Sequence, residues 1–145
     1  MSFLSSFNIS GSGMTAQKYR LDIISQNIAN AQVTRTEDGQ PYRRKMTVLS
    51  SVSAGTFQDA LKTANGAVQN EGVQVEAVIE DGSPLVPVYD PTHPDANAQG
   101  YVMYPNVTTA QEMTDAMGAS RAYEANVTAF NATKAIVMKA LEIGR

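Results

Sequence analysis

The chain has 145 residues, a formal net charge of −3 and no cysteine. This length suits one domain with a modest core, and the acidic balance excludes the basic field with which proteins hold nucleic acid or anionic lipid. The lack of cysteine excludes a disulfide framework and a thiolate metal site. No apolar run approaches the roughly 20 residues of a membrane-spanning helix, so no direct membrane insertion is expected.

An N-terminal helix is predicted by apolar side chains that recur every seven positions. We expect it to run from about Met14 to Ala31, within a terminal segment that ends near residue 34. An extension back to Phe3 is disfavoured, because Gly11 and Gly13 each cost about 1 kcal/mol relative to alanine in a helix interior. The apolar positions are Phe7, Met14, Leu21 and Ile28.

The central part of the chain is predicted to be β-rich. All six prolines lie between residues 35 and 106, and a long helix cannot run through such a segment. Polarity alternates over 45–52 and again over 73–79, and turn-forming residues bound both runs, as they do around short strands. Residues 57–67 fit a weak helix or a loop equally well. We therefore expect a small β-rich insert over 35–106.

A second long helix is predicted at the C-terminal end. Its heptad pattern covers about 108–143, which corresponds to about 54 Å at the α-helical rise per residue. Together the elements predict an α+β fold, in which 1–34 and 107–145 form one discontinuous domain, an antiparallel coiled-coil pair of long helices, around the insert. The apolar positions of the second helix are Ala116, Tyr123, Phe130 and Val137.

Both predicted helices contain long runs without a charged side chain, over residues 23–34 and 125–133. An isolated coiled coil uses charged flanking positions for solvation and for choice of partner. A helix that avoids charge around much of its circumference is normally buried around much of it. One partner helix cannot supply that burial, so neighbouring subunits are predicted. On the heptad pattern alone, an ordinary helical hairpin core is the alternative.

Several motifs occur in an order typical of one protein family. The stretch SQNIANA over residues 25–31 resembles the N-terminal signature of the bacterial flagellar axial proteins, the rod, hook and junction subunits, in which an Asn-x-x-Asn pair closes the first helix. DGQPYRRK over 38–45, HPDANAQGYV over 93–102 and ASRAYEANV over 119–127 extend the resemblance over most of the chain. The HPDANAQGYV stretch and the short length favour the proximal-rod branch; a hook or distal rod subunit is the alternative within the family.

The resemblance implies a structural subunit of the flagellar basal body, not an enzyme, and no cofactor. Such subunits assemble helically into a hollow drive shaft that crosses the periplasm, transmits torque and passes exported subunits. The implied partners are further copies, neighbouring rod subunits of the FliE, FlgB, FlgF and FlgG types, and the flagellar type III export apparatus. Residues 1–13 lack the basic and apolar regions of a cleaved signal peptide, as that export route leads us to expect.

The resemblance also suggests a role for asparagine. In a tube wall a charge would have to lose water or find a partner, whereas the amides of Asn27, Asn30 and Asn126 offer donors and acceptors without a charge. Asn30 is further expected to end the first helix in the left-handed conformation. The alternative is that Asn30 is only a helix cap and Asn27 a solvated position. The predicted assembly interface comprises Leu21, Ile24, Asn27, Ile28, Ala29, Asn30, Ala31, Tyr123, Ala125, Asn126, Val127, Phe130, Val137 and Leu141.

The single histidine is the residue that most suggests chemistry. His93 stands between Asp90 and Asp95 in DPTHPD, which is a weak signal for a metal site or general base, and the adjacent prolines favour a rigid turn. The chain has no Gly-x-Ser-x-Gly, P-loop or His-Glu-x-x-His motif. No catalytic, cofactor-binding or metal residue is therefore predicted. A small secreted enzyme or binding module that uses the Asp90–Asp95 loop is the alternative from a different class.

Overall fold

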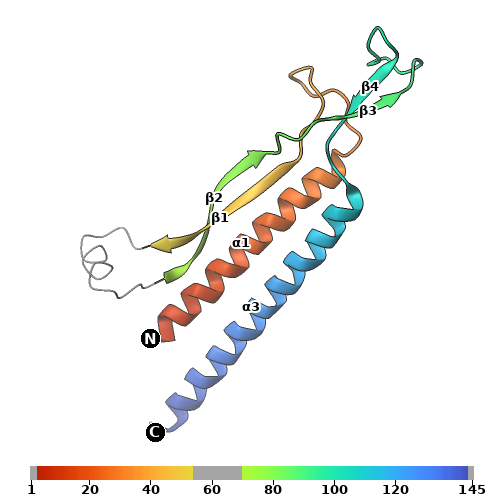
Figure 1. The fold of residues 1–145 in the computed structure, drawn as a ribbon. Helices are drawn as coiled ribbons and strands as arrows, with labels where there is room; N and C mark the ends of the chain where they lie inside the picture. The colour runs from red at the N-terminus through yellow and green to blue at the C-terminus, as the bar shows by residue number, and fades with distance from the viewer. Residues whose placement is uncertain (1–2, 54–69, 144–145) are drawn as a thin grey trace. The chain divides into compact units, whose positions relative to one another are not determined.

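The computed structural model describes residues 3–53 and 70–143, and Figure 1 shows their order along the chain. Two long helices lie at the ends of the described chain and short strands lie between them, which confirms the predicted α+β class. Residues 57–67, for which a helix and a loop were both open, fall outside the described part. The elements are α1 (Phe3–Ala29), β1 (Lys45–Ser53), β2 (Asn70–Glu80), β3 (Val86–Tyr89), β4 (Tyr101–Tyr104) and α3 (Thr109–Ile143).

Helix α1 begins at Phe3, so the expected start near Met14 was wrong. Packing against α3 accounts for the difference, because tertiary contacts contribute more to helix stability than propensity does. The Phe7 and Phe130 rings pack edge to face with their centroids 4.8 Å apart. A Cβ on Gly13 would lie 2.8 Å from Oδ1 of Asn126, so the glycine permits the close approach of α3 at this position.

Helix α1 ends at Ala29, and Asn30 closes it without a left-handed backbone. Among the described residues only glycines have a positive φ, so the expected left-handed conformation of Asn30 was wrong. Instead, the backbone N–H and the side-chain Nδ2 of Asn30 both donate to the carbonyl oxygen of Gln26, at 3.0 and 2.8 Å. The side chain thus supports the final turn of the helix directly.

Helix α3 has almost the predicted bounds. Pro105 precedes it, and the carbonyl oxygen of Thr108 accepts the N–H groups of Gln111 and Glu112, each at 3.0 Å. Glu112 lies in the first turn, where a carboxylate interacts favourably with the positive end of the helix dipole. The start of the helix is therefore specified locally, by a proline outside it and an acid inside it.

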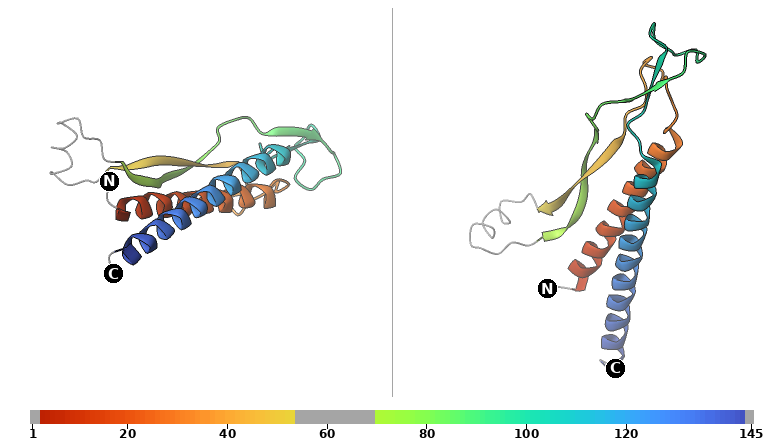
Figure 2. Two further views of the ribbon diagram at one scale, coloured as in Figure 1. Left: turned by 90° about the horizontal axis from the view of Figure 1, so that it is seen from below. Right: turned by 45° about the vertical axis from the view of Figure 1, so that its right-hand side comes forward.

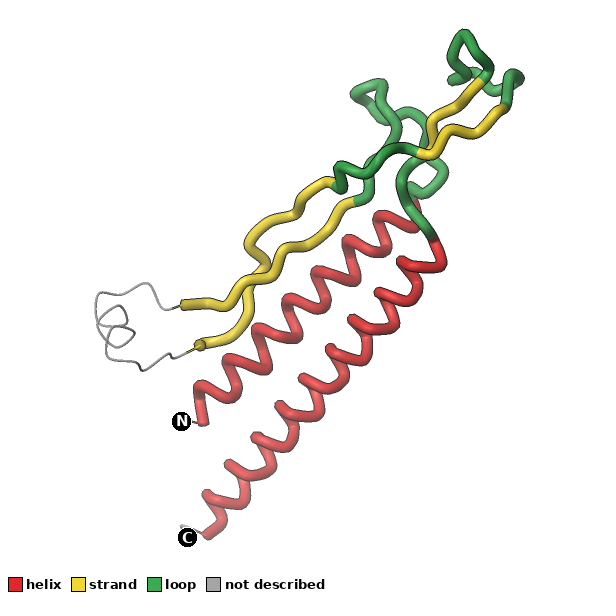
Figure 3. The backbone as a smooth tube through the Cα atoms, in the orientation of Figure 1, coloured by secondary structure: helices red, strands yellow, loops and turns green. Residues whose placement is uncertain are grey.

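The strands form two separate two-stranded sheets, β1 with β2 and β3 with β4. The β1–β2 pair confirms the two strands predicted from alternation, and both views of Figure 2 show these strands side by side. The antiparallel β3–β4 hairpin was not predicted, because its strands have four residues each and one contains Pro87. Figure 3 shows the loops in green, and two of their glycines have a positive φ: Gly39, between α1 and β1, at 73°, and Gly100, between β3 and β4, at 81°.

The contacts divide the chain into two compact units, and each contains part of both helices. The first unit combines Met1–Tyr19, Val48–Ala77 and Ala119–Arg145, and its buried residues are small: Ser10, Ala16 and Ala119 are covered. Within it, rising residue numbers on α1 meet falling numbers on α3, so the helix segments are antiparallel. The coiled-coil character of the pair, and its separation from the insert as a domain, stay predictions.

The second unit combines Arg20–Thr47 with Val78–Gly118. Its core is partly apolar and partly polar. The buried apolar side chains include Ile23, Ile24 and Val102, and the buried polar side chains are those of Asn27 and Glu112. The polar part of this core is the candidate functional site.

Candidate functional site

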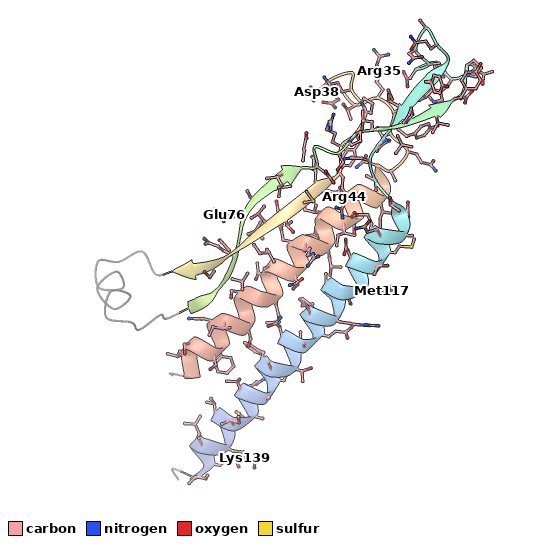
Figure 4. All side chains as sticks on the ribbon, viewed as in Figure 1. Arg35, Asp38, Arg44, Glu76, Met117 and Lys139 are labelled. Atoms are coloured by element: carbon pink, nitrogen blue, oxygen red, sulfur yellow. The ribbon has the colours of Figure 1, made fainter. Side chains whose placement is uncertain are left out.

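An ion pair between Arg44 and Glu112 lies at the centre of the site. Arg44 directly precedes β1, and its Nε donates to Oε1 of Glu112 at 2.6 Å. The arginine also reaches Asp115 at 3.2 Å and Asp81 at 4.0 Å. Glu112 is fully buried, and Figure 4 labels Arg44 beside the start of β1. Because a buried carboxylate is costly unless paired and hydrogen-bonded, the arginine is what makes this position tolerable.

Asn27 supplies the second set of contacts, and its amide uses every donor and acceptor it has. Its Nδ2 donates to the carbonyl oxygen of Lys45 at 2.8 Å and to Oε2 of Glu112 at 3.0 Å. Its Oδ1 accepts the Tyr42 hydroxyl and the Lys45 N–H, each at 2.9 Å. These four hydrogen bonds exhaust the capacity of the amide. Asn27 therefore fastens the last turns of α1 to both β1 and α3.

Tyr42 completes the buried group as a neutral donor. Burial raises the pKa of Tyr42 above its ordinary value, and the negative charges of Glu112 and Glu80 act in the same direction. The hydroxyl thus keeps its proton and donates to Oδ1 of Asn27. A neutral phenol is the form that this acid-rich site favours.

Asn106 and Asp81 connect the site to the segments that flank it. Oδ1 of Asn106 accepts the Arg44 N–H at 2.9 Å, and its Nδ2 donates to the carbonyl oxygens of Asp81 and Ser83 at 3.2 and 3.3 Å. Hydrogen bonds from the Ser83 side chain and backbone hold the pKa of Asp81 below its usual value, so its carboxylate is ionised where Arg44 approaches. We call the set Asn27, Tyr42, Arg44, Asn106 and Glu112 the polar brace.

The polar brace is suited to holding segments together and not to catalysis. Both carboxylate oxygens of Glu112 and all the polar capacity of Asn27 are occupied inside the chain. Within residues 3–53 and 70–143, no group of three or more His, Asp and Glu side chains is arranged to hold a metal ion. No helix among the same residues is long and apolar enough to cross a membrane.

The DPTHPD loop is held by its own polar groups. Asp90 accepts the N–H and hydroxyl of Thr92, and Nδ1 of His93 accepts the Asp95 N–H at 3.1 Å. Asp95 accepts the Thr34 hydroxyl at 2.8 Å. The Thr92 bonds hold the pKa of Asp90 below its usual value. These contacts give each group a structural role in the turn.

The predicted interface residues fall into three groups by burial. Ile24 and Asn27 are buried inside the chain, where Asn27 belongs to the polar brace. The exposed members lie on both helices, and the remainder are partly covered. The exposed residues are Ala29, Tyr123, Ala125 and Leu141, and the partly covered ones are Leu21, Ile28, Asn30, Ala31, Asn126, Val127, Phe130 and Val137.

Four members of the polar brace were missed by sequence reasoning: Tyr42, Arg44, Asn106 and Glu112. The charge pattern held a signal. Glu112 and Asp115 are the only acidic residues between 109 and 123, and a basic run, Arg43 to Lys45, ends on the first residue of β1. The site therefore combines the predicted asparagine with a buried charge that was not expected.

Comparison with protein families defines the class of this chain. Residues 7–35 match the family described as flagella basal body rod protein, and residues 98–143 match the one described as flagellar basal body rod FlgEFG protein C-terminal. The first segment contains Asn27 and the second contains Asn106 and Glu112. The two helices and their part of the polar brace are thus those of a flagellar rod protein.

Individual relatives define the family more narrowly. The flagellar basal-body rod protein FlgC of Bacillus subtilis (strain 168) is 48% identical over 151 aligned residues, which cover 100% of both chains. FlgC of Borreliella burgdorferi is 42% identical over 99% of this chain and 98% of the relative. FlgC of Escherichia coli O157:H7 is 43% identical over 100% of both. The chain belongs to the flagellar basal-body rod protein FlgC family.

This membership confirms the resemblance that the sequence motifs indicated. It also confirms the prediction that the chain is a structural protein of the basal-body rod and not an enzyme. The relatives that align over the whole chain are named as rod proteins. Assembly with other basal-body rod proteins follows from the same membership.

Proposed function

We propose that this chain is a subunit of the proximal rod that packs helically, with copies of itself and with neighbouring rod proteins, into a hollow torque-transmitting shaft. The observation that carries the proposal is that both long helices leave apolar side chains uncovered, in a chain whose relatives are rod proteins. A folded monomer that worked alone would cover more of these side chains.

The uncovered side chains are concentrated on α3. Ile143 is 87% exposed and Leu141 is 68% exposed near its C-terminal end, and Leu4 on α1 is 73% exposed. Exposed apolar surface of this extent on a long helix favours burial against other helices. The other large apolar residues of α3 that are more than half exposed are Met113, Met117, Ile136 and Met138.

The uncharged runs support the same packing. Ala29 and Ala125 are exposed, and each lies in a run without a charged side chain. Small uncharged residues on an exposed helix face let a neighbouring helix approach closely, because no charged side chain has to lose its water. We propose that coiled-coil contacts between subunits cover these faces, and that the exposed and partly covered members of the predicted interface form them.

The polar brace supports transmission of force. It joins α1, the start of β1 and α3 through Asn27, Arg44 and Glu112, so the ends of both helices share one buried set of bonds. A torque applied to one helix would reach the other through these bonds. We further propose that the rod crosses the periplasm, that the chain leaves the cytoplasm through the flagellar type III export apparatus, and that its rod neighbours are of the FliE, FlgB, FlgF and FlgG types.

The test uses the bacterium that encodes the chain. Deletion of its gene is expected to stop rod completion and swimming, and a tagged copy is expected to restore both and to be recovered in purified basal bodies. Swimming by the deletion strain, or restored cells whose basal bodies lack the tagged chain, would overturn the proposal.

A further inference from the structure

The ring of His93 is a hydrogen-bond acceptor in the loop between β3 and β4. Its Nδ1 accepts the backbone N–H of Asp95 at 3.1 Å, so the ring is neutral and carries its proton on Nε2. A protonated ring has a hydrogen on both nitrogens and cannot accept this bond. Because histidine is the side chain that changes charge between about pH 5 and pH 8, acidification removes the acceptor of the Asp95 N–H.

Asp95 connects this histidine to a second segment of the chain. Oδ2 of Asp95 accepts the Thr34 hydroxyl at 2.8 Å, and its Oδ1 lies 3.7 Å from Nη1 of Arg35. Thr34 and Arg35 belong to the segment between α1 and β1, and both lie with Asp95 in the lining of a hollow of about 420 Å³. All these residues belong to the second compact unit. A change at His93 therefore reaches a contact between two loops and not only its own turn.

The charges around the ring determine how it responds to a proton. Nδ1 of His93 lies 4.0 Å from Oδ2 of Asp95, the same oxygen that accepts the Thr34 hydroxyl. Asp90 supplies a second carboxylate of the same loop, and Arg35 is the cation that the segment after α1 brings to Asp95. A protonated ring is attracted to the Asp95 carboxylate. There it competes with the Thr34 hydroxyl for Oδ2 and with Arg35 for the same negative charge.

We propose that His93 is a pH-sensitive switch in the DPTHPD turn. While the ring is neutral, it holds the Asp95 N–H, and the Asp95 carboxylate is left to Thr34 and Arg35. On acidification Nδ1 becomes a donor, the bond to the amide breaks, and the ring pairs with the carboxylate. The contact between the β3–β4 loop and the segment after α1 is thereby weakened, and the hollow that both line changes in charge and shape. This device is independent of the proposed rod function.

Nuclear magnetic resonance of the full-length chain, labelled with ¹⁵N and ¹³C, tests the switch between about pH 8 and about pH 5.5. At the upper end, wild type should show a neutral His93 ring with its proton on Nε2. As the pH falls, the amide and carboxyl resonances of Asp95 should move together with those of the ring nitrogens. His93→Asn is the matched control, because its Oδ1 can replace Nδ1 as the acceptor and does not titrate. In this variant the Asp95 amide should stay bonded over the whole range.

Two further substitutions test the competition for the Asp95 carboxylate. Thr34→Val removes the hydroxyl at Oδ2, and Arg35→Gln removes the competing cation. Each should shift the midpoint of the Asp95 response to higher pH, because the protonated ring then has one competitor fewer. Thr36→Val is the control and should leave the midpoint unchanged, since its hydroxyl donates to the carbonyl oxygen of Gln40.

Three results would contradict the inference. A His93 ring that stays neutral down to about pH 5.5, or an Asp95 amide that responds equally in wild type and in His93→Asn, would overturn the switch. A response that depends on His93 but has the same midpoint in Thr34→Val, Arg35→Gln and Thr36→Val would overturn the coupling to the second loop. None of these measurements requires assembly, so they stand apart from the test of the rod function.

Discussion

Nε of Arg44 lies 2.6 Å from Oε1 of Glu112, and this pair places a carboxylate with no solvent exposure in the first turn of α3. Oε2 of the same carboxylate accepts a bond from Asn27. The ends of both helices therefore depend on one buried charge, and its removal is the most direct test of the polar brace.

Glu112→Gln is expected to lower the free energy of unfolding by about 3 kcal/mol, because it leaves the Arg44 guanidinium without its closest buried partner. Urea unfolding followed by far-UV circular dichroism measures the loss. Glu124→Gln on the exposed side of α3 is the matched control and should change stability by less than about 0.5 kcal/mol. Equal effects of the two substitutions would mean that the buried ion pair contributes nothing particular.

Asn27→Asp is expected to be as damaging as loss of Glu112. It removes the donor to the Lys45 carbonyl oxygen and places a second carboxylate 3.0 Å from Oε2 of Glu112. Like charges at that distance in a buried site cost about 3 kcal/mol or more. Asn131→Asp, at an exposed position of α3, is the control. Comparable urea midpoints for the two variants would contradict the assignment of Asn27 as a fully bonded buried amide.

The raised pKa of Tyr42 predicts that the free energy of unfolding declines at alkaline pH. Because burial raises its folded-state pKa above the value of 10.0, the folded state holds the phenol proton more tightly than the unfolded state. Stability from this group is complete below pH 10 and is lost as the pH rises toward and through the raised pKa. Tyr42→Phe should cost about 1 kcal/mol at neutral pH through its lost hydrogen bond. The difference between wild type and variant should then shrink above pH 10, as read from urea midpoints across that range. A stability difference between wild type and Tyr42→Phe that stays constant above pH 10 would contradict the raised pKa of Tyr42.

Two glycines in α1 should respond differently to replacement by alanine. Gly11→Ala meets nothing within 4 Å and should raise the free energy of unfolding by up to about 1 kcal/mol through helix propensity. Gly13→Ala should give no gain, because the new Cβ would lie 2.8 Å from Oδ1 of Asn126. In an Asn126→Ala background the obstacle is absent, so Gly13→Ala should regain its benefit. Similar thermal midpoints for the two single variants would contradict the close helix approach at Gly13.

Charge on the exposed helix faces should block assembly but not folding. Ala125→Glu lies within α3, where glutamate is a good helix former, so the isolated chain should be almost unaffected. Ala29→Glu opposes the helix dipole at the end of α1 and should cost about 0.5 kcal/mol. Both are expected to be exported yet to give incomplete rods, because a buried unpaired carboxylate costs several kcal/mol in every copy. Ser51→Glu on β1 is the exposed control. Normal swimming and complete rods in cells that carry Ala29→Glu, and also in cells that carry Ala125→Glu, would show that these helix faces contact water in the rod.

Sequence reasoning predicted the elements that have a period and missed those that do not. The heptad repeat indicated both helices, and alternation indicated β1 and β2. The start of α1 was misplaced because glycine propensity is local, whereas Phe130 and Asn126, which lie against Phe7 and Gly13, are more than a hundred residues away in sequence. Strands β3 and β4 are too short for a periodic signal.

The candidate site was predicted only in part, for a related reason. Asn27 was selected as an uncharged polar group at the end of a helix, and it does bond backbone groups there. Its pairing with Glu112 spans 85 positions, and no local pattern reports such a contact. Position in sequence cannot show whether an acid lies in water or in a core, so the buried carboxylate required the structure.

The same separation of 85 positions sets an order of events in folding. Asn27 can bond Tyr42 and Lys45 early, but its bond to Glu112 forms only when the chain through Glu112 is available, and closing a loop of this length has an entropic cost. A chain that emerges end first from a narrow opening would therefore complete the polar brace only after Glu112 has passed. The buried carboxylate that stabilises the finished subunit thus also delays the moment at which the subunit becomes rigid.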